Sequence, residues 1–259
     1  MNTFADYILD EKKLGQKMEI AYYLSKKAKV FFDKSTVFKT EIARLFLNYS
    51  KIEVDKNFVL TACILCNCKK SNNAKDIEEI HSYAKQGSKY LREIGFGKKF
   101  CKVCEEVNRY SKSNPREKES DILELVDQFG GMLLYRPERI GFKADEALVL
   151  LEHRNLKNDY NRYMSTFIDF VNFMENVKLK EMENTNVFKG LIKTYNETPK
   201  LTTFIEEVVN EYEPEVDKLI IEQNDKISLQ MMNKEGQTNR PLFSQETAKK
   251  IMTSMYDEK

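Results

Sequence analysis

The sequence predicts an all-α fold, a bundle of helices packed around an apolar core. Apolar residues recur every three or four positions along most of the 259-residue chain, which is the pattern of amphipathic helices. Hydrophobic residues make up 41% of the chain, enough to fill a core. Glycine (9 residues) and proline (5 residues) are too scarce for the many tight turns of an all-β fold.

The first half of the chain should form five helices, each with apolar residues on one face. The third is apolar on nearly all sides, so we expect it near the centre, with Asp55 capping its amino end. Gly95 and Gly97 should end the fourth, because glycine favours the backbone conformation found at helix ends. The five helices are predicted over residues 16–32, 36–49, 57–70, 74–94 and 98–110.

The second half should begin with a buried helix whose apolar residues between Leu125 and Leu133 share one face. Pro137 should stop this helix, because proline lacks the backbone N–H and its ring clashes with a helix interior. A short helix should start near Lys143, and an apolar stripe from Tyr160 to Met174 predicts a long core helix. Further helices are predicted over residues 201–212, 216–227 and 244–255, with a flexible linker at 232–243.

The charge pattern gives no reason to expect binding to a nucleic acid polymer, because the net charge is only +1. The signs are nevertheless segregated along the chain. Residues 69–102 hold nine Lys or Arg against four Asp or Glu, whereas residues 206–225 hold eight Asp or Glu against one Lys. The basic segment would suit a phosphate-bearing ligand, and the acidic helices would pack over it or pair between subunits as a homodimer. Two solvated helix faces are the simpler alternative.

The amino-terminal residues carry acids and lack the apolar core of a signal peptide. No run approaches the length of about 18 apolar residues that a membrane span requires. We therefore expect a cytoplasmic protein without a membrane span. In that reducing compartment the five cysteines should mostly be thiols.

The stretch Leu125–Arg139, LVDQFGGMLLYRPER, contains the strongest functional signal. It places a lone carboxylate, Asp127, beside an apolar face, where an unpaired charge is costly, so Asp127 should be ion-paired, hydrogen-bonded or metal-bound. The stretch resembles the last motif of the HD-GYP branch of the HD phosphohydrolase superfamily. Asp127 matches the metal-ligand Asp of that motif, and Arg136 to Arg139 match its RPxR end. Gly130 stands where the family has a second Asp.

The resemblance extends over residues 36–175 in the family's order and spacing. The early family His falls near Thr40, and the HDxGK motif falls on Cys66 to Lys70. His81 matches the next His, and Glu105 and Glu106 stand where the family has a His-His pair. On this basis the chain divides into an N-terminal helix (1–35), a degenerate HD-GYP-like domain (36–180) and a C-terminal helical extension (181–259).

The resemblance implies a binuclear metal site that activates water, but among its usual ligands only His81 and Asp127 remain. It therefore implies a catalytically inactive module that senses a nucleotide such as cyclic di-GMP, or binds a protein partner, in signalling. The alternative is a phosphodiesterase that hydrolyses a cyclic dinucleotide through an altered, carboxylate-rich site for Mn, Fe or Mg. If the module is inactive, no cofactor is expected. The related HDOD signalling domains, which also lack the ligands, are a third interpretation, less favoured because the RPxR end is retained.

The implied site residues fall into two groups. The ligand-binding residues would be Lys70, Arg136 and Arg139, and the metal ligands, if a metal site persists, would be His81, Asp127, Glu105 and Glu106. The simpler alternative is that His81 and Asp127 form ordinary hydrogen bonds and that the arginines hold helix carbonyl groups.

The cysteines allow a second chemistry. Cys63, Cys66 and Cys68 should share one helix, and Cys101 and Cys104 another. Two CxxC pairs can bind zinc or an iron–sulfur cluster. These pairs lie inside predicted helices, however, and free cysteine is among the most buried residue types, so packed thiols are the preferred interpretation.

Overall fold

The computed structural model describes most of the chain up to residue 225. The described residues are 4–10, 13–28, 30–70, 77–107, 116–136, 139–156, 161–179, 185–209, 217–218, 220–222 and 225. The chain divides into two compact units, Met1–Asp217 and Lys218–Lys259. All that follows concerns the first unit. The predicted linker at 232–243 and the predicted helix at 244–255 lie outside the described residues.

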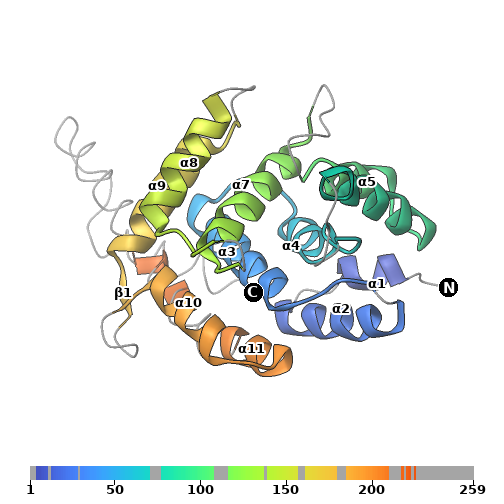
Figure 1. The fold of residues 1–259 in the computed structure, drawn as a ribbon, viewed down its shortest axis with the longest axis horizontal. Coiled ribbons are helices and arrows are strands. Elements are labelled where there is room, and N and C mark those ends of the chain that lie inside the picture. Colours follow the sequence, from blue (N-terminus) through green and yellow to red (C-terminus); the bar gives the residue numbers. More distant parts are fainter. Residues whose placement is uncertain are drawn as a thin grey trace, which may run out of the picture. The chain divides into compact units, whose positions relative to one another are not determined.

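The described chain is predominantly helical, which confirms the predicted all-α class (Figure 1). Two short strands, β1 (Lys178–Leu179) and β2 (Thr185–Asn186), pair antiparallel with Lys178 opposite Asn186. The helices are α1 (Phe4–Asp10), α2 (Leu14–Ala28), α3 (Lys34–Ser50), α4 (Lys56–Leu65), α5 (Ile77–Glu93), α6 (Lys98–Glu105), α7 (Lys118–Leu133), α8 (Ala144–Leu156), α9 (Met164–Asn176), α10 (Val187–Glu197) and α11 (Leu201–Glu207).

The core of the first unit is centred on α3, which packs against α4, α7, α9 and α11 (Figure 1). Residues 36–47 of α3 are all buried, so this helix is covered on every side. The prediction that 57–70 would be central is confirmed for α4, which contacts α3, α6 and α7 as well as α1 and α2.

Aromatic rings join the helices on one side of α3. The Phe167 ring of α9 lies 5.0 Å from the Phe46 ring of α3 and 5.3 Å from the Phe129 ring of α7, both edge-to-face. Phe188 of α10 also meets Phe129 edge-to-face, at 5.3 Å. Each such pair contributes about 0.5–1.5 kcal/mol beyond simple burial. This cluster fixes α7, and with it Asp127, against α3.

Several helix ends are where the sequence predicts them. Asp55 caps α4 by accepting a hydrogen bond from the Phe58 backbone N–H at 3.1 Å, as predicted. Asp33 caps α3 in the same way through Thr36, at 3.2 Å. Gly95, with φ of 105°, lies just beyond α5, where a residue with a Cβ would be strained.

The chain after α4 departs from the predicted helix over 57–70. The α-helix ends at Leu65, and the next residues form tighter turns in which Cys68 N donates to Leu65 O and Lys70 N donates to Asn67 O. The Cys68 carbonyl accepts a hydrogen bond from the Phe31 backbone N–H, so it is not available to continue a helix. This turn directs Asn67 toward α7.

Four elements were not predicted individually: α1, α10 and the two strands of the short hairpin, β1 and β2, although α10 falls in the predicted C-terminal helical extension (181–259). Helix α10 is capped by Asn186, whose side chain accepts from Lys189 N at 2.9 Å, and it buries Val187, Phe188 and Leu191. The predicted domain limits at residues 35 and 180 stay predictions. Within the described ranges no helix is long and apolar enough to cross a membrane.

Candidate functional site

Asp127 of α7 is the centre of the candidate site. Lys39 Nζ of α3 donates to Asp127 Oδ1 at 2.6 Å, and Asn67 Nδ2, from the turn after α4, donates to the same oxygen at 2.9 Å. The Lys39 side chain is 7% exposed and that of Asp127 is 16% exposed, so this ion pair is largely shielded from water. Asp127 is therefore ion-paired and hydrogen-bonded, two of the three outcomes expected for a carboxylate on an apolar face.

Gly130 of α7 makes room for the Lys39 side chain, and the next residue, Gly131, lies close to Arg136. A Cβ atom on Gly130 would lie 2.9 Å from Lys39 Cγ and 3.3 Å from Ile42 Cδ1, closer than carbon atoms pack. A Cβ atom on Gly131 would lie 3.2 Å from Arg136 Nη2 and 3.8 Å from Lys39 Nζ. Any side chain at position 130 would thus compete with the Lys39 stem for the same space. The position of the Lys39 side chain therefore requires glycine at position 130.

Positive charge dominates the surroundings of Asp127. Burial alone would raise the pKa of Asp127, but the charges of Lys39 and Lys70 and the hydrogen bonds from Lys39 and Asn67 hold it well below its usual range. The neighbouring Lys39 charge, burial and the Arg136 charge lower the pKa of Lys70, although Asp127 partly offsets them. Two cations, Lys39 and Lys70, therefore act on one carboxylate, and the site favours a further negative charge.

The two arginines of the RPxR end lie next to this cluster. The backbones of Arg136 and Arg139 exchange hydrogen bonds, each 3.0 Å long. The Arg139 guanidinium donates to Met132 O at 2.9 Å and to Gly131 O at 2.5 Å, so it caps the carboxyl end of α7. Arg139 thus holds helix carbonyl groups, as the simpler alternative predicts. It also lines the pocket described next.

A pocket of about 450 Å³ opens beside Asp127. This volume lies within the range of about 300–1,000 Å³ that is typical of small-molecule sites. The residues that line it come from the last turns of α7, from the loop that follows and from α8. The lining residues are Asp127, Gln128, Gly131, Met132, Arg136, Arg139, Phe142 and Leu150.

The structure brings together part of the predicted site. Asp127, Arg136 and Arg139 line the same pocket, and Lys70 acts on Asp127 electrostatically. Glu106 instead accepts a hydrogen bond from Ser120 Oγ at 2.5 Å, and Glu105 ends α6.

The metal ligand set of the sequence analysis does not assemble from its carboxylates. Among the described side chains no three His, Cys, Asp or Glu gather into a group that could hold a metal ion, and Glu105, Glu106 and Asp127 are all described. His81 belongs to α5, but its side chain lies outside the described residues, so its role stays a prediction.

All five cysteines are free and buried. Burial raises the pKa of Cys63 and of Cys68 to about 12 and raises that of Cys66 and Cys104 well above the ordinary value. Among the described residues these thiols form no group able to hold a metal ion. They pack between α4, α6 and the turn after α4, as packed thiols would.

Lys39 is the site residue that sequence reasoning missed. A signal for it exists: Lys39 precedes Ile42 by three residues and Phe46 by seven, so it lies on the apolar face of the predicted second helix. A lysine there needs a buried acceptor. The sequence alone does not show that this acceptor is Asp127, 88 residues away.

Comparisons of the chain with protein-family models, with curated proteins and with solved structures find no match.

Proposed function

We propose that the protein is a non-catalytic binding module, similar to a degenerate HD-GYP domain, whose pocket beside Asp127 binds a phosphate-bearing small molecule. A cyclic dinucleotide is the first ligand to test. The observation that carries the proposal is the ion pair between Lys39 and Asp127. If the resemblance holds, the ammonium group stands where the family would hold a metal ion.

The fit between Lys39 and Gly130 supports this interpretation. In the HD-GYP motif the position of Gly130 carries a second Asp, and here the Lys39 stem takes up the space of any side chain at that position. A compact cation fixed by Asp127 Oδ1 supplies positive charge without a metal. The ammonium cannot activate water as a metal does, because it offers no open coordination position. The arrangement therefore suits binding better than hydrolysis.

The charge of the pocket supports an anionic ligand. Lys39 is ion-paired with Asp127, and the other charged residues that line the pocket are Arg136 and Arg139. Arginine binds phosphate oxygens through paired, charge-assisted hydrogen bonds. Arg136→Gln is the variant to test, because replacing Arg139 would also remove its hydrogen bonds to the end of α7 and so disturb the fold.

Calorimetric titration of the full chain with cyclic di-GMP, GMP and inorganic phosphate tests the proposal. We expect binding that weakens about 10- to 100-fold in Arg136→Gln, the loss of one hydrogen bond to a charged group. Arg92→Gln, which removes the same charge from an exposed position on α5, is the matched control and should bind as the wild type does. Equal affinity in wild type and Arg136→Gln would remove this pocket as the site.

The enzyme hypothesis makes a different prediction for the same samples. A phosphodiesterase with an altered metal site would hydrolyse cyclic di-GMP in the presence of Mn²⁺ or Fe²⁺ and would lose that activity in Asp127→Ala. Metal analysis of the purified protein separates the two, since the two-metal mechanism requires about two ions per chain. Hydrolysis with that dependence would replace the present proposal.

A further inference from the structure

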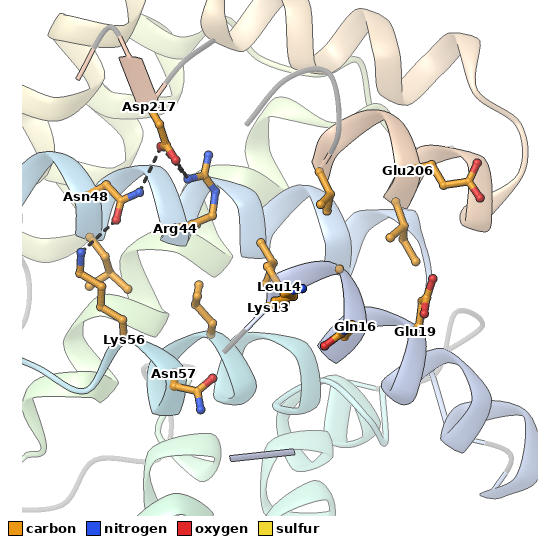
Figure 2. Close-up of a pocket in the computed structure, with 15 residues that line it drawn as sticks. Lys13, Leu14, Gln16, Glu19, Arg44, Asn48, Lys56, Asn57, Glu206 and Asp217 are labelled. Atoms are coloured by element: carbon orange, nitrogen blue, oxygen red, sulfur yellow. Dashed lines mark hydrogen bonds and ion pairs between the residues drawn. The ribbon is translucent and has the colours of Figure 1, made fainter. Parts of the chain in front are cut away.

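A second pocket, of about 660 Å³, lies between α2, α3, α4 and α11, away from Asp127 (Figure 2). Its size is again within the range of about 300–1,000 Å³ that small-molecule sites occupy. Apolar side chains form much of its wall, among them Leu14, Leu47, Leu60 and Val209. Arg44, Lys56 and Asp217 lie at one end, Glu19 and Glu206 lie at the other, and Lys13 lies between them beside Leu14 (Figure 2).

One end of this pocket holds a carboxylate in a fully formed seat. Arg44 Nη1 donates to both oxygens of Asp217, at 2.6 and 2.7 Å, and Asn48 Nδ2 donates to Asp217 Oδ1 at 3.1 Å (Figure 2). Lys56 Nζ in turn donates to Asn48 Oδ1 at 3.0 Å and so orients the amide. The Arg44 side chain is 6% exposed, whereas that of Asp217 is 32% exposed. The arginine thus belongs to the wall, and the carboxylate enters from the solvent side.

A ligand carboxylate in the place of Asp217 would leave the charge balance of the seat unchanged. Arg44 is also paired with Glu41 of the same helix, through Nε and Nη2 at 2.8 Å each, and its Nη1 faces Asp217. Losing Asp217 would leave donors of Arg44 and Asn48 without that carboxylate, which is the condition under which a buried site takes up another anion.

The opposite end of the pocket carries negative charge. Glu19 and Glu206 line it, and in Figure 2 both lie on the side away from Asp217. These carboxylates disfavour a second anionic group at the far end of a ligand. The pocket therefore favours a molecule with one anionic head and an apolar body.

We propose that this pocket binds a small amphipathic monocarboxylate, and that Asp217 is a built-in competitor that occupies the carboxylate seat in the ligand-free protein. Asp217 stands in for the ligand's carboxylate, with Arg44 and Asn48 as the donors. The apolar body of the ligand lies along Leu14, Leu47 and Leu60. This site is independent of the proposed function, because it shares no lining residue with the pocket beside Asp127.

Removing the competitor should tighten binding. A tethered group competes at an effective concentration on the order of millimolar, so only a minor fraction of the wild-type protein presents an open seat. Titration of the full chain with decanoate should therefore give an affinity at least tenfold tighter in Asp217→Ala than in wild type. Asp217→Asn keeps the shape of the side chain and removes its charge, so it should also bind decanoate more tightly than wild type does. It replaces Asp217→Ala in the test if the alanine variant does not fold.

Two further ligands test the head group and the far end. Decanol, which lacks the carboxylate, should gain nothing from Asp217→Ala. Decanedioate, which adds a second carboxylate, should bind less tightly than decanoate because of Glu19 and Glu206. An equal gain for decanol and decanoate, or no gain for decanoate, would overturn the proposal.

The position of the site is tested in the Asp217→Ala background. Leu60→Phe fills the middle of the pocket and should abolish decanoate binding, with the helical circular dichroism spectrum as the check that the chain is folded. Arg136→Gln changes the other pocket and should leave decanoate affinity unchanged. Loss of decanoate binding in Arg136→Gln, or its survival in folded Leu60→Phe, would place the ligand elsewhere.

Discussion

Lys39 lies across Gly130 so closely that a Cβ atom at position 130 would be 2.9 Å from Lys39 Cγ. The lysine is held there by Asp127, one turn of α7 before the glycine, through a contact of 2.6 Å. The site therefore depends on the lack of a side chain at position 130 as much as on the charges of Lys39 and Asp127.

Gly130→Ala should destabilise the protein by about 1–3 kcal/mol, because the new methyl group overpacks against Lys39 and Ile42. The ordinary gain from alanine in a helix, about 1 kcal/mol, opposes this cost, so the net loss should lie in the lower part of that range. Urea unfolding measures the difference. Gly87→Ala, inside α5, is the control, because a Cβ atom there would make only ordinary contacts, 3.5 Å from Cys66 O and from Cys68 Sγ. A Gly130→Ala protein as stable as Gly87→Ala would contradict the close fit.

Lys39→Met should cost about 3–5 kcal/mol, the penalty for leaving a buried carboxylate without its ionic partner. The double variant Lys39→Met with Asp127→Leu removes both charges and should be less destabilised than the sum of the two single variants. Lys85→Met, at an exposed position of α5, controls for the loss of a lysine. Simple additivity in the unfolding free energies would show that the two residues are not energetically coupled.

The ion pair should also make stability depend on pH in a defined direction. The folded protein holds the pKa of Asp127 well below its usual range, so above the ordinary Asp pKa of about 3.9 its stabilising contribution is complete. As pH falls below that value the unfolded chain takes up the proton first, and the contribution shrinks. The stability difference between wild type and Asp127→Asn should therefore be large at pH 7 and smaller at pH 3. A difference that grows on acidification would mean that the pKa is raised instead.

The thiols should be unreactive in the folded protein. All five are buried, and burial raises the pKa of Cys63 and Cys68 to about 12, so the reactive thiolate form is scarce at neutral pH. Reaction with a thiol reagent such as dithiobisnitrobenzoate should be slow in buffer and should reach five groups per chain in concentrated urea. Rapid reaction of several thiols in buffer would show that this part of the core opens readily.

Much of the helical architecture could be predicted from the sequence, because apolar periodicity and capping residues act locally. The predicted helix over 36–49 corresponds to α3 (Lys34–Ser50), and Asp55 caps α4 as expected. Helix α10 was not predicted individually because its apolar face is short. Its burial depends on the long-range contact between Phe188 and Phe129 in the aromatic cluster. The turn after α4 likewise includes a hydrogen bond from Phe31 N to Cys68 O, between residues far apart in the sequence.

The candidate site was only half predictable for the same reason. The sequence marks Asp127 as a buried acid that needs a partner, and Arg136 and Arg139 as a basic pair near it. It does not reveal that Lys39 supplies the partner, since an ion pair between α3 and α7 is set by how the helices pack. The seat for Asp217 on Arg44 is a contact of the same long-range kind.

The most direct test of the central claim is titration of the full chain with cyclic di-GMP after divalent metals have been removed by chelation. If Lys39 supplies the positive charge at Asp127, binding should persist without metal and should weaken about 10- to 100-fold in Arg136→Gln. Binding that disappears on chelation and returns with Mn²⁺, together with hydrolysis of the ligand, would contradict the account.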